Sequence, residues 1–95
     1  MEENTVCAHA LISGKVQGVF FRMETLRVVE GIGGVTGWVK NRPDGTVEAV
    51  FEGSRPRVEA VLDWCREGPP RAQVAALKVS WEAPTGRYER FAITG

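Results

Sequence analysis

Hydrophobic and polar residues alternate along several short stretches of the chain, which is the period-two pattern of a strand with one buried face. In the first stretch the even positions hold only aliphatic side chains, whereas the odd positions include His9 and Ser13. The turn sequence Pro43-Asp44-Gly45 separates two further stretches, which therefore form a hairpin. The predicted strands cover residues 6–13, 35–40, 47–51 and 77–81, with a short fifth strand at 91–93.

Two other stretches carry residues spaced three and four positions apart, the spacing of one face of a helix. The first predicted helix runs from about Phe21 to Glu30, and glycines just beyond it end the helix. The second begins after Ser54 as N-cap, carries Pro56 in its first turn and ends before Gly68. The two stripes consist of Phe21, Thr25, Val28, Val29 and Ile32, and of Val58, Val61, Leu62 and Cys65.

The order of these elements is βαββαβ plus a short extra strand, which predicts an α+β fold. Two strand–helix units joined by a hairpin, with each strand patterned for one covered face, are typical of a ferredoxin-like sandwich. We therefore expect an antiparallel sheet with both helices on one face. The 95 residues fit a single domain over 1–95, because typical domains contain about 100–150 residues.

The charge balance excludes several classes of protein. Twelve basic and twelve acidic residues give a net charge of zero, which argues against nucleic-acid and membrane-surface partners. No apolar run approaches the ~18 residues that span a bilayer, and the acidic start Met-Glu-Glu-Asn-Thr lacks the features of a signal peptide. Cys7 and Cys65 are too few and too far apart for a zinc site or a disulfide framework. These features predict a cytoplasmic protein with two free thiols and no metal site.

The segment from Gly14 to Arg22 carries the sharpest chemical signal. A glycine-containing loop between a strand and a helix can turn backbone N–H groups inward as an anion nest, and the helix adds its N-terminal dipole. A cation at that helix end is unfavourable, so Arg22 needs a compensating anion, for which its planar donors suit phosphate. The spacings of a Walker loop and of a dinucleotide fingerprint are absent. Spacing alone leaves open that the glycines only form a turn and that Arg22 is solvated.

Three motifs follow one another along the chain: Gly14-Lys15-Val16-Gln17-Gly18-Val19-Phe20-Phe21-Arg22, then Gly37-Trp38-Val39-Lys40-Asn41, then Asp44-Gly45-Thr46-Val47-Glu48. Together they resemble the acylphosphatase family, and the resemblance extends from the first predicted strand through residues 68–72 to the last. It implies an enzyme that hydrolyses acyl phosphates to a carboxylate and inorganic phosphate by in-line attack of water, without metal or cofactor. Inorganic phosphate is then expected to be product and inhibitor, and the protein a monomer.

The resemblance also implies roles for individual residues. Arg22 corresponds to the family's catalytic arginine and Asn41 to its water-positioning asparagine. The amide of Asn41 can both donate and accept, so it can orient a water without being ionised. Without the resemblance, Asn41 would be interpreted as part of a local turn with the residues that follow it. The phosphate-binding loop corresponds to Lys15, Val16, Gln17, Gly18, Val19 and Phe20.

The chain departs from the family pattern in one place. Between Arg22 and Asn41 it is one residue longer, and it reads Glu30-Gly31-Ile32-Gly33-Gly34 where an alanine and a leucine-glycine pair are usual. This predicts a distorted end of the first helix, without loss of activity.

Two other functions remain as alternatives. An RNA-binding ferredoxin-like module would stack bases on exposed aromatics of the sheet, but the expected aromatic pattern is missing. Trp38, Trp64 and Trp81 are predicted to complete packing or to cover the surface of the sheet. A regulatory module that binds phosphate or carbamoyl phosphate within a larger protein would share the fold and the loop, but the length of the chain favours the enzyme. The single histidine, His9, is expected to have a structural or surface role.

Overall fold

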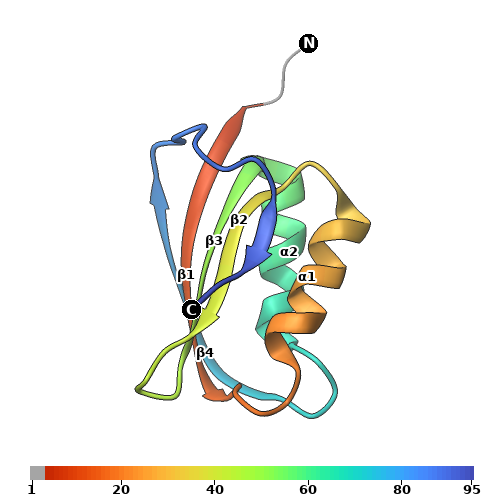
Figure 1. Ribbon diagram of the computed structural model, residues 1–95, viewed down its shortest axis with the longest axis vertical. Coiled ribbons are helices and arrows are strands. Elements are labelled where there is room, and N and C mark those ends of the chain that lie inside the picture. Colours follow the sequence, from red (N-terminus) through yellow and green to blue (C-terminus); the bar gives the residue numbers. More distant parts are fainter. Residues whose placement is uncertain (1–3) are drawn as a thin grey trace.

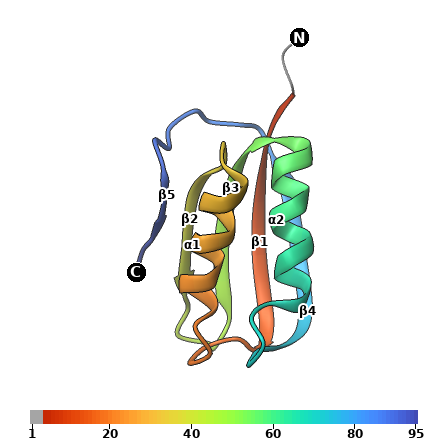
Figure 2. The ribbon, with the colours of Figure 1, turned by 90° about the vertical axis from the view of Figure 1, so that its right-hand side faces the viewer.

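Two helices cover one face of a five-stranded sheet in the computed structural model of the chain, which describes residues 4–95 (Figures 1 and 2). Residues 1–3, the start of the acidic segment that lacks the features of a signal peptide, lie outside the described residues. No helix within 4–95 is long and apolar enough to cross a membrane. The elements are β1 (Thr5–Lys15), α1 (Phe21–Ile32), β2 (Thr36–Asn41), β3 (Val47–Ser54), α2 (Arg55–Glu67), β4 (Gln73–Glu82) and β5 (Phe91–Ile93).

The sheet order is β4-β1-β3-β2-β5, as expected for a ferredoxin-like α+β fold with one added strand. The four longer strands pair antiparallel, as predicted, whereas the short added strand β5 pairs with β2 in parallel. The reason lies in the segment 83–90, which crosses one end of the sheet from the β4 edge to the β2 edge (Figure 2). The chain reverses direction after β4 and so runs alongside β2 in the same sense.

A buried carboxylate holds this crossing segment. Glu52 on β3 is only 5% exposed, and its carboxylate accepts hydrogen bonds from the backbone N–H of Thr85 at 3.1 Å and of Gly86 at 2.6 Å. The hydroxyl of Thr85 donates a third, at 3.2 Å. Burial alone would raise the pKa of Glu52, but these hydrogen bonds outweigh it and hold the pKa below its ordinary value.

The core lies between the helices and the face of the sheet that they cover. As the alternation predicts, the even residues of β1 from Ala8 to Ile12 are buried in this core. The stripe of α2 is confirmed in full, and in α1 the buried residues are Phe21, Thr25 and Val29. Cys65 belongs to the core, whereas Cys7 is buried on the other side of the sheet beside Glu52, and both are free thiols.

The end of α1 is regular, and a side chain of α2 caps its last carbonyls. The helix continues to Ile32, two residues beyond the predicted end, and the Gly33 N–H donates to the Val29 carbonyl at 2.9 Å. Arg57 on α2 donates to the carbonyls of Ile32 at 2.9 Å and Gly33 at 3.0 Å. Gly33 and Gly34 both have positive φ, 77° and 72°. The expected distortion is therefore confined to these two glycines after the helix, where side chains would be strained.

Gly37 allows β2 to lie tightly against β3. Its φ is 134°, and a Cβ at this position would stand 1.9 Å from the carbonyl oxygen of Val50. No other residue fits without moving the strand. This close pairing fixes the position of β2 against β3, and therefore also the position of Asn41, the last residue of β2.

Candidate anion-binding active site

A pocket of about 340 Å³ lies where the loop after β1, the first turn of α1, the end of β2 and the end of β5 meet. The first three lie at the same end of the molecule (Figure 1). The volume is sufficient for a small organic phosphate. The pocket is lined by Val16, Gly18, Phe20, Phe21, Arg22, Met23, Asn41 and Ile93.

The backbone of the loop has an unusual conformation on entering α1. Gly18 has φ of 74°, and Phe20 at the N-cap has φ of 67°, the single non-glycine residue with positive φ in 4–95. A left-handed phenylalanine costs about 1–2 kcal/mol, and such strain is concentrated at ligand sites. No side chain caps α1, so the first N–H groups of the helix remain available to a ligand.

Arg22 brings a fixed positive charge to this helix end. Within residues 4–95 it has no ion-pair partner, and the first-turn acid Glu24 lies instead near Arg27, at 4.0 Å. The helix dipole disfavours a cation here. A bound anion would therefore be attracted by the guanidinium, by the dipole and by the free N–H groups together.

Asn41 reaches the same pocket from the other side, as the last residue of β2. Its Oδ1 is buried and accepts no hydrogen bond from residues 4–95. A buried amide oxygen without a partner is costly. The Oδ1 atom is therefore a suitable acceptor for a hydrogen of water or ligand. Despite the additional residue between Arg22 and Asn41, both line the same pocket.

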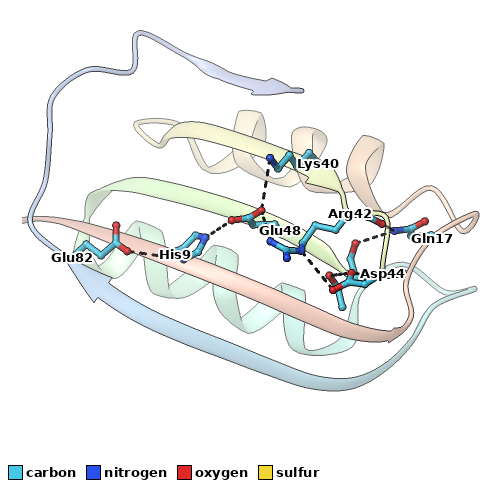
Figure 3. Close-up of polar contacts among 8 residues, drawn as sticks. His9, Gln17, Lys40, Arg42, Asp44, Glu48 and Glu82 are labelled. Atoms are coloured by element: carbon cyan, nitrogen blue, oxygen red, sulfur yellow. Dashed lines mark hydrogen bonds and ion pairs between the residues drawn. The ribbon is translucent and has the colours of Figure 1, made fainter. Parts of the chain in front are cut away.

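Gln17 joins the loop to the hairpin that follows Asn41 (Figure 3). Its side-chain amide donates to the carbonyl of Arg42 at 2.7 Å and to that of Thr46 at 2.9 Å. The Arg42 N–H in turn donates to the Thr46 carbonyl at 2.8 Å. The Gln17 side chain is thus occupied by the protein itself, a role that the sequence analysis did not predict.

The residues predicted to bind phosphate lie in two settings. Val16, Gly18 and Phe20 line the pocket, as do the predicted catalytic residues, whereas Lys15, Gln17 and Val19 do not line it. Lys15 is exposed at the end of β1, and Val19 is buried in the core. Because the Gln17 side chain is engaged and Val19 is buried, these two can contact an anion in the pocket only through their backbone.

Gly18 adopts a backbone conformation that favours glycine, with φ of 74°. A Cβ on Gly18 would have no atom of the protein within 4 Å. Within the protein itself, substitution would therefore act through the left-handed φ.

The acidic side chains of the β2–β3 hairpin and of β3 near Asn41, Asp44 and Glu48, are engaged with other residues (Figure 3). Glu48 bonds His9 at 2.6 Å and Arg42 at 3.1 Å, and Asp44 accepts from the Thr46 hydroxyl at 2.6 Å. Burial would raise the pKa of Glu48, but the contacts with His9 and Arg42 outweigh it and lower the pKa. The His9 side chain is partly exposed and is engaged by Glu48. No histidine or carboxylic acid lines the pocket, and residues 4–95 hold no group of three or more potential metal ligands.

Three pocket residues were not predicted as site residues: Phe21, which was predicted only as part of the α1 stripe, Met23 and Ile93. Met23 carried a signal, because it is a large apolar residue next to Arg22 that lies outside the stripe of α1. Ile93 carried none, because only the parallel pairing of β5 with β2 brings it near Asn41.

An α+β sandwich that presents a fixed cation and free backbone donors in one small pocket has the features of an anion-binding protein suited to phosphate. Comparison with known proteins gives the family: the sequence profile of acylphosphatases matches residues 8–93. A curated acylphosphatase of Pelotomaculum thermopropionicum is 52% identical over 86 residues, which cover 90% of this chain and 92% of the relative. The solved acylphosphatase from Coxiella burnetii has a TM-score of 0.89 and 38% identity, over 96% of this chain and 94% of that chain. The chain belongs to the acylphosphatase family.

The fold also occurs inside a larger protein. The structure of full-length HypF in its phosphate- and nucleotide-bound form has a TM-score of 0.84 at 22% identity and matches all of this chain but only 12% of its own. At this identity the likeness shows the fold alone. The more identical acylphosphatases are matched over nearly their whole length, which favours the enzyme over both alternatives.

Proposed function

We propose that this protein hydrolyses acyl phosphates and that Arg22 and Asn41 carry out the reaction in the pocket described above. The observation that carries the proposal is the meeting of these two side chains at the uncapped N-terminus of α1. Membership in the acylphosphatase family supports the reaction.

In the proposed complex the phosphoryl group is bound by Arg22 and by backbone N–H groups of residues 15–20. The guanidinium offers two parallel donors to two phosphoryl oxygens. Each charge-assisted hydrogen bond contributes roughly 1.5–3 kcal/mol. Donors fixed in place before the reaction also stabilise the charge that develops on the equatorial oxygens in the transition state.

Asn41 orients the attacking water in this proposal. The water oxygen forms a bond to phosphorus on the side opposite the carboxylate, and the bond between phosphorus and the carboxylate oxygen breaks. The carboxylate leaves with the electron pair, and the proton of the water passes to solvent or to a phosphate oxygen. The enzyme forms no covalent intermediate, and its own groups supply the charge stabilisation.

The lining of the pocket favours a leaving group that needs no proton. A carboxylate leaves without one, whereas an alkoxide requires a general acid. No histidine, aspartate or glutamate lines the pocket, and Glu48 and Asp44 are engaged elsewhere. Acyl phosphates are therefore expected to react and simple alkyl phosphomonoesters to be nearly inert.

The test is release of inorganic phosphate from benzoyl phosphate by the purified protein, with and without a chelator. We expect turnover that the chelator does not change, and almost no release from glycerol phosphate at the same concentration. Absence of turnover on benzoyl phosphate would refute the function. Comparable rates on the two substrates would show that an acid donor is present after all.

Three further features belong to the same proposal. Inorganic phosphate, as product, should compete with substrate for Arg22 and the loop. The protein should be a monomer, which light scattering after size-exclusion chromatography would measure against 10.4 kDa. We also propose a cytoplasmic location, which the two free buried thiols suit.

A further inference from the structure

Large apolar side chains gather at the mouth of the pocket. Within residues 4–95 the large hydrophobic residues that remain exposed are Phe20 at 65%, Met23 at 50%, Trp81 at 44% and Ile93 at 36%. All of them except Trp81 line the same pocket as Arg22 and Asn41. Single exposed apolar residues are ordinary, but a group of them at one site indicates an apolar contact.

These three side chains come from separate parts of the fold. Phe20 stands at the strained N-cap of α1, Met23 follows in the first turn, and Ile93 ends β5. Keeping them exposed costs the free energy that their burial would gain, about 25 cal/mol per Å². Neither the packing of α1 nor that of β5 requires them, because each element buries other residues, Phe21 and Phe91 among them.

The polar groups of the pocket are already assigned in the proposed function. Arg22 is its only charged lining residue and Asn41 its only other polar side chain, and these act on the phosphoryl group and the water. The remaining lining is apolar or glycine. It offers no partner to a charged or strongly hydrated group on the other part of the substrate, whose desolvation would be uncompensated.

We infer that Phe20, Met23 and Ile93 form a subsite for the acyl group and that the enzyme selects acyl phosphates with an apolar acyl group, aromatic or aliphatic. This inference rests on the proposed function, because the acyl group is defined only once the phosphoryl group occupies Arg22. Contact with the subsite strengthens binding of a benzoyl group but contributes little to an acetyl group, which is too small to reach it. An additional carboxylate on the acyl group is disfavoured.

The experiment measures kcat/KM for benzoyl phosphate and for acetyl phosphate in wild type, Met23→Gln and Ile93→Thr. Glutamine keeps the length and helix propensity of methionine, and threonine keeps the β-branched shape of isoleucine. Trp81→Gln is the matched control, because Trp81 is an exposed apolar residue outside the pocket. The ratio of benzoyl to acetyl kcat/KM is expected to fall about three- to tenfold in each pocket variant and to stay unchanged in the control.

The inhibition constant of inorganic phosphate separates this subsite from the phosphate site and from misfolding, and it should be the same in all four proteins. In wild type, 4-carboxybenzoyl phosphate should react with a kcat/KM roughly tenfold below that of benzoyl phosphate. An unchanged ratio in both pocket variants, or an equal fall in Trp81→Gln, would overturn the subsite while leaving the hydrolysis intact. If wild type hydrolyses neither benzoyl nor acetyl phosphate, the proposed function itself fails.

Discussion

Arg22 illustrates how a residue that is unfavourable for the fold indicates function. It places a cation at the positive end of α1 without a partner among residues 4–95, a position that a bound anion would stabilise. Arg22→Lys keeps the charge but loses the planar pair of donors. We expect it to remove most of the turnover of benzoyl phosphate and to weaken inhibition by phosphate. Near-wild-type turnover would reject Arg22 as the group that holds the phosphoryl oxygens.

Asn41 should affect turnover rather than binding. Its buried Oδ1 has no partner among residues 4–95, so its removal leaves no other group of the protein unpaired. Asn41→Ala is expected to lower kcat by very roughly 10²–10³-fold, as for loss of another positioned polar group. The inhibition constant of phosphate should change much less. If both change equally, Asn41 is a binding residue and the water is oriented by something else.

Among the elements, the loop and the β2–β3 hairpin are coupled through one side chain. Gln17 donates to the carbonyls of Arg42 and Thr46, and a carboxylate there would face two acceptors with no hydrogen to share. Gln17→Glu is therefore expected to destabilise the protein by about 1–3 kcal/mol in urea unfolding and to lower kcat. Gln73→Glu, an exposed glutamine on β4, is the matched control and should leave both measurements unchanged.

The elements were predictable from the sequence to the extent that they depend on local patterns. The alternation in β1 and the stripe in α2 are imposed by one buried face, so the sequence shows them directly. The parallel pairing of β5 depends on Glu52 holding a segment more than thirty positions away, which no local pattern records. The same holds for Ile93 at the pocket and for the side chain of Gln17. Motifs located Arg22 and Asn41, whereas the residues around them are brought together only by the fold.

For the molecule as a whole, Glu52 links stability to pH. Its pKa in the folded protein lies below the ordinary value of 4.5, so its contribution is complete above about pH 4.5 and is lost as the pH falls through the folded-state value. Glu52→Gln should lower the free energy of unfolding by about 1–3 kcal/mol at pH 7, and the difference from wild type should shrink at acid pH. Urea unfolding between pH 7 and pH 3 measures this difference.

The control is Glu89→Gln, an exposed glutamate in the same crossing segment. It should show no comparable loss at pH 7. A difference between wild type and Glu52→Gln that stays constant across the pH range would mean that the carboxylate is not the source of the stabilisation.

The short parallel strand β5 is expected to open locally before the rest of the protein unfolds. It has three residues, pairs with β2 alone and carries Ile93 into the pocket, so it has the fewest contacts to lose of any strand in the sheet. In native-state hydrogen exchange, the Thr94 amide, which bonds the Val39 carbonyl at 2.9 Å, should exchange by local opening, while amides between β1 and β3 exchange by global unfolding. On heating, β5 would then detach and withdraw Ile93 from the pocket before the protein unfolds cooperatively. Thermal inactivation, followed with benzoyl phosphate, should begin below the temperature at which circular dichroism reports unfolding.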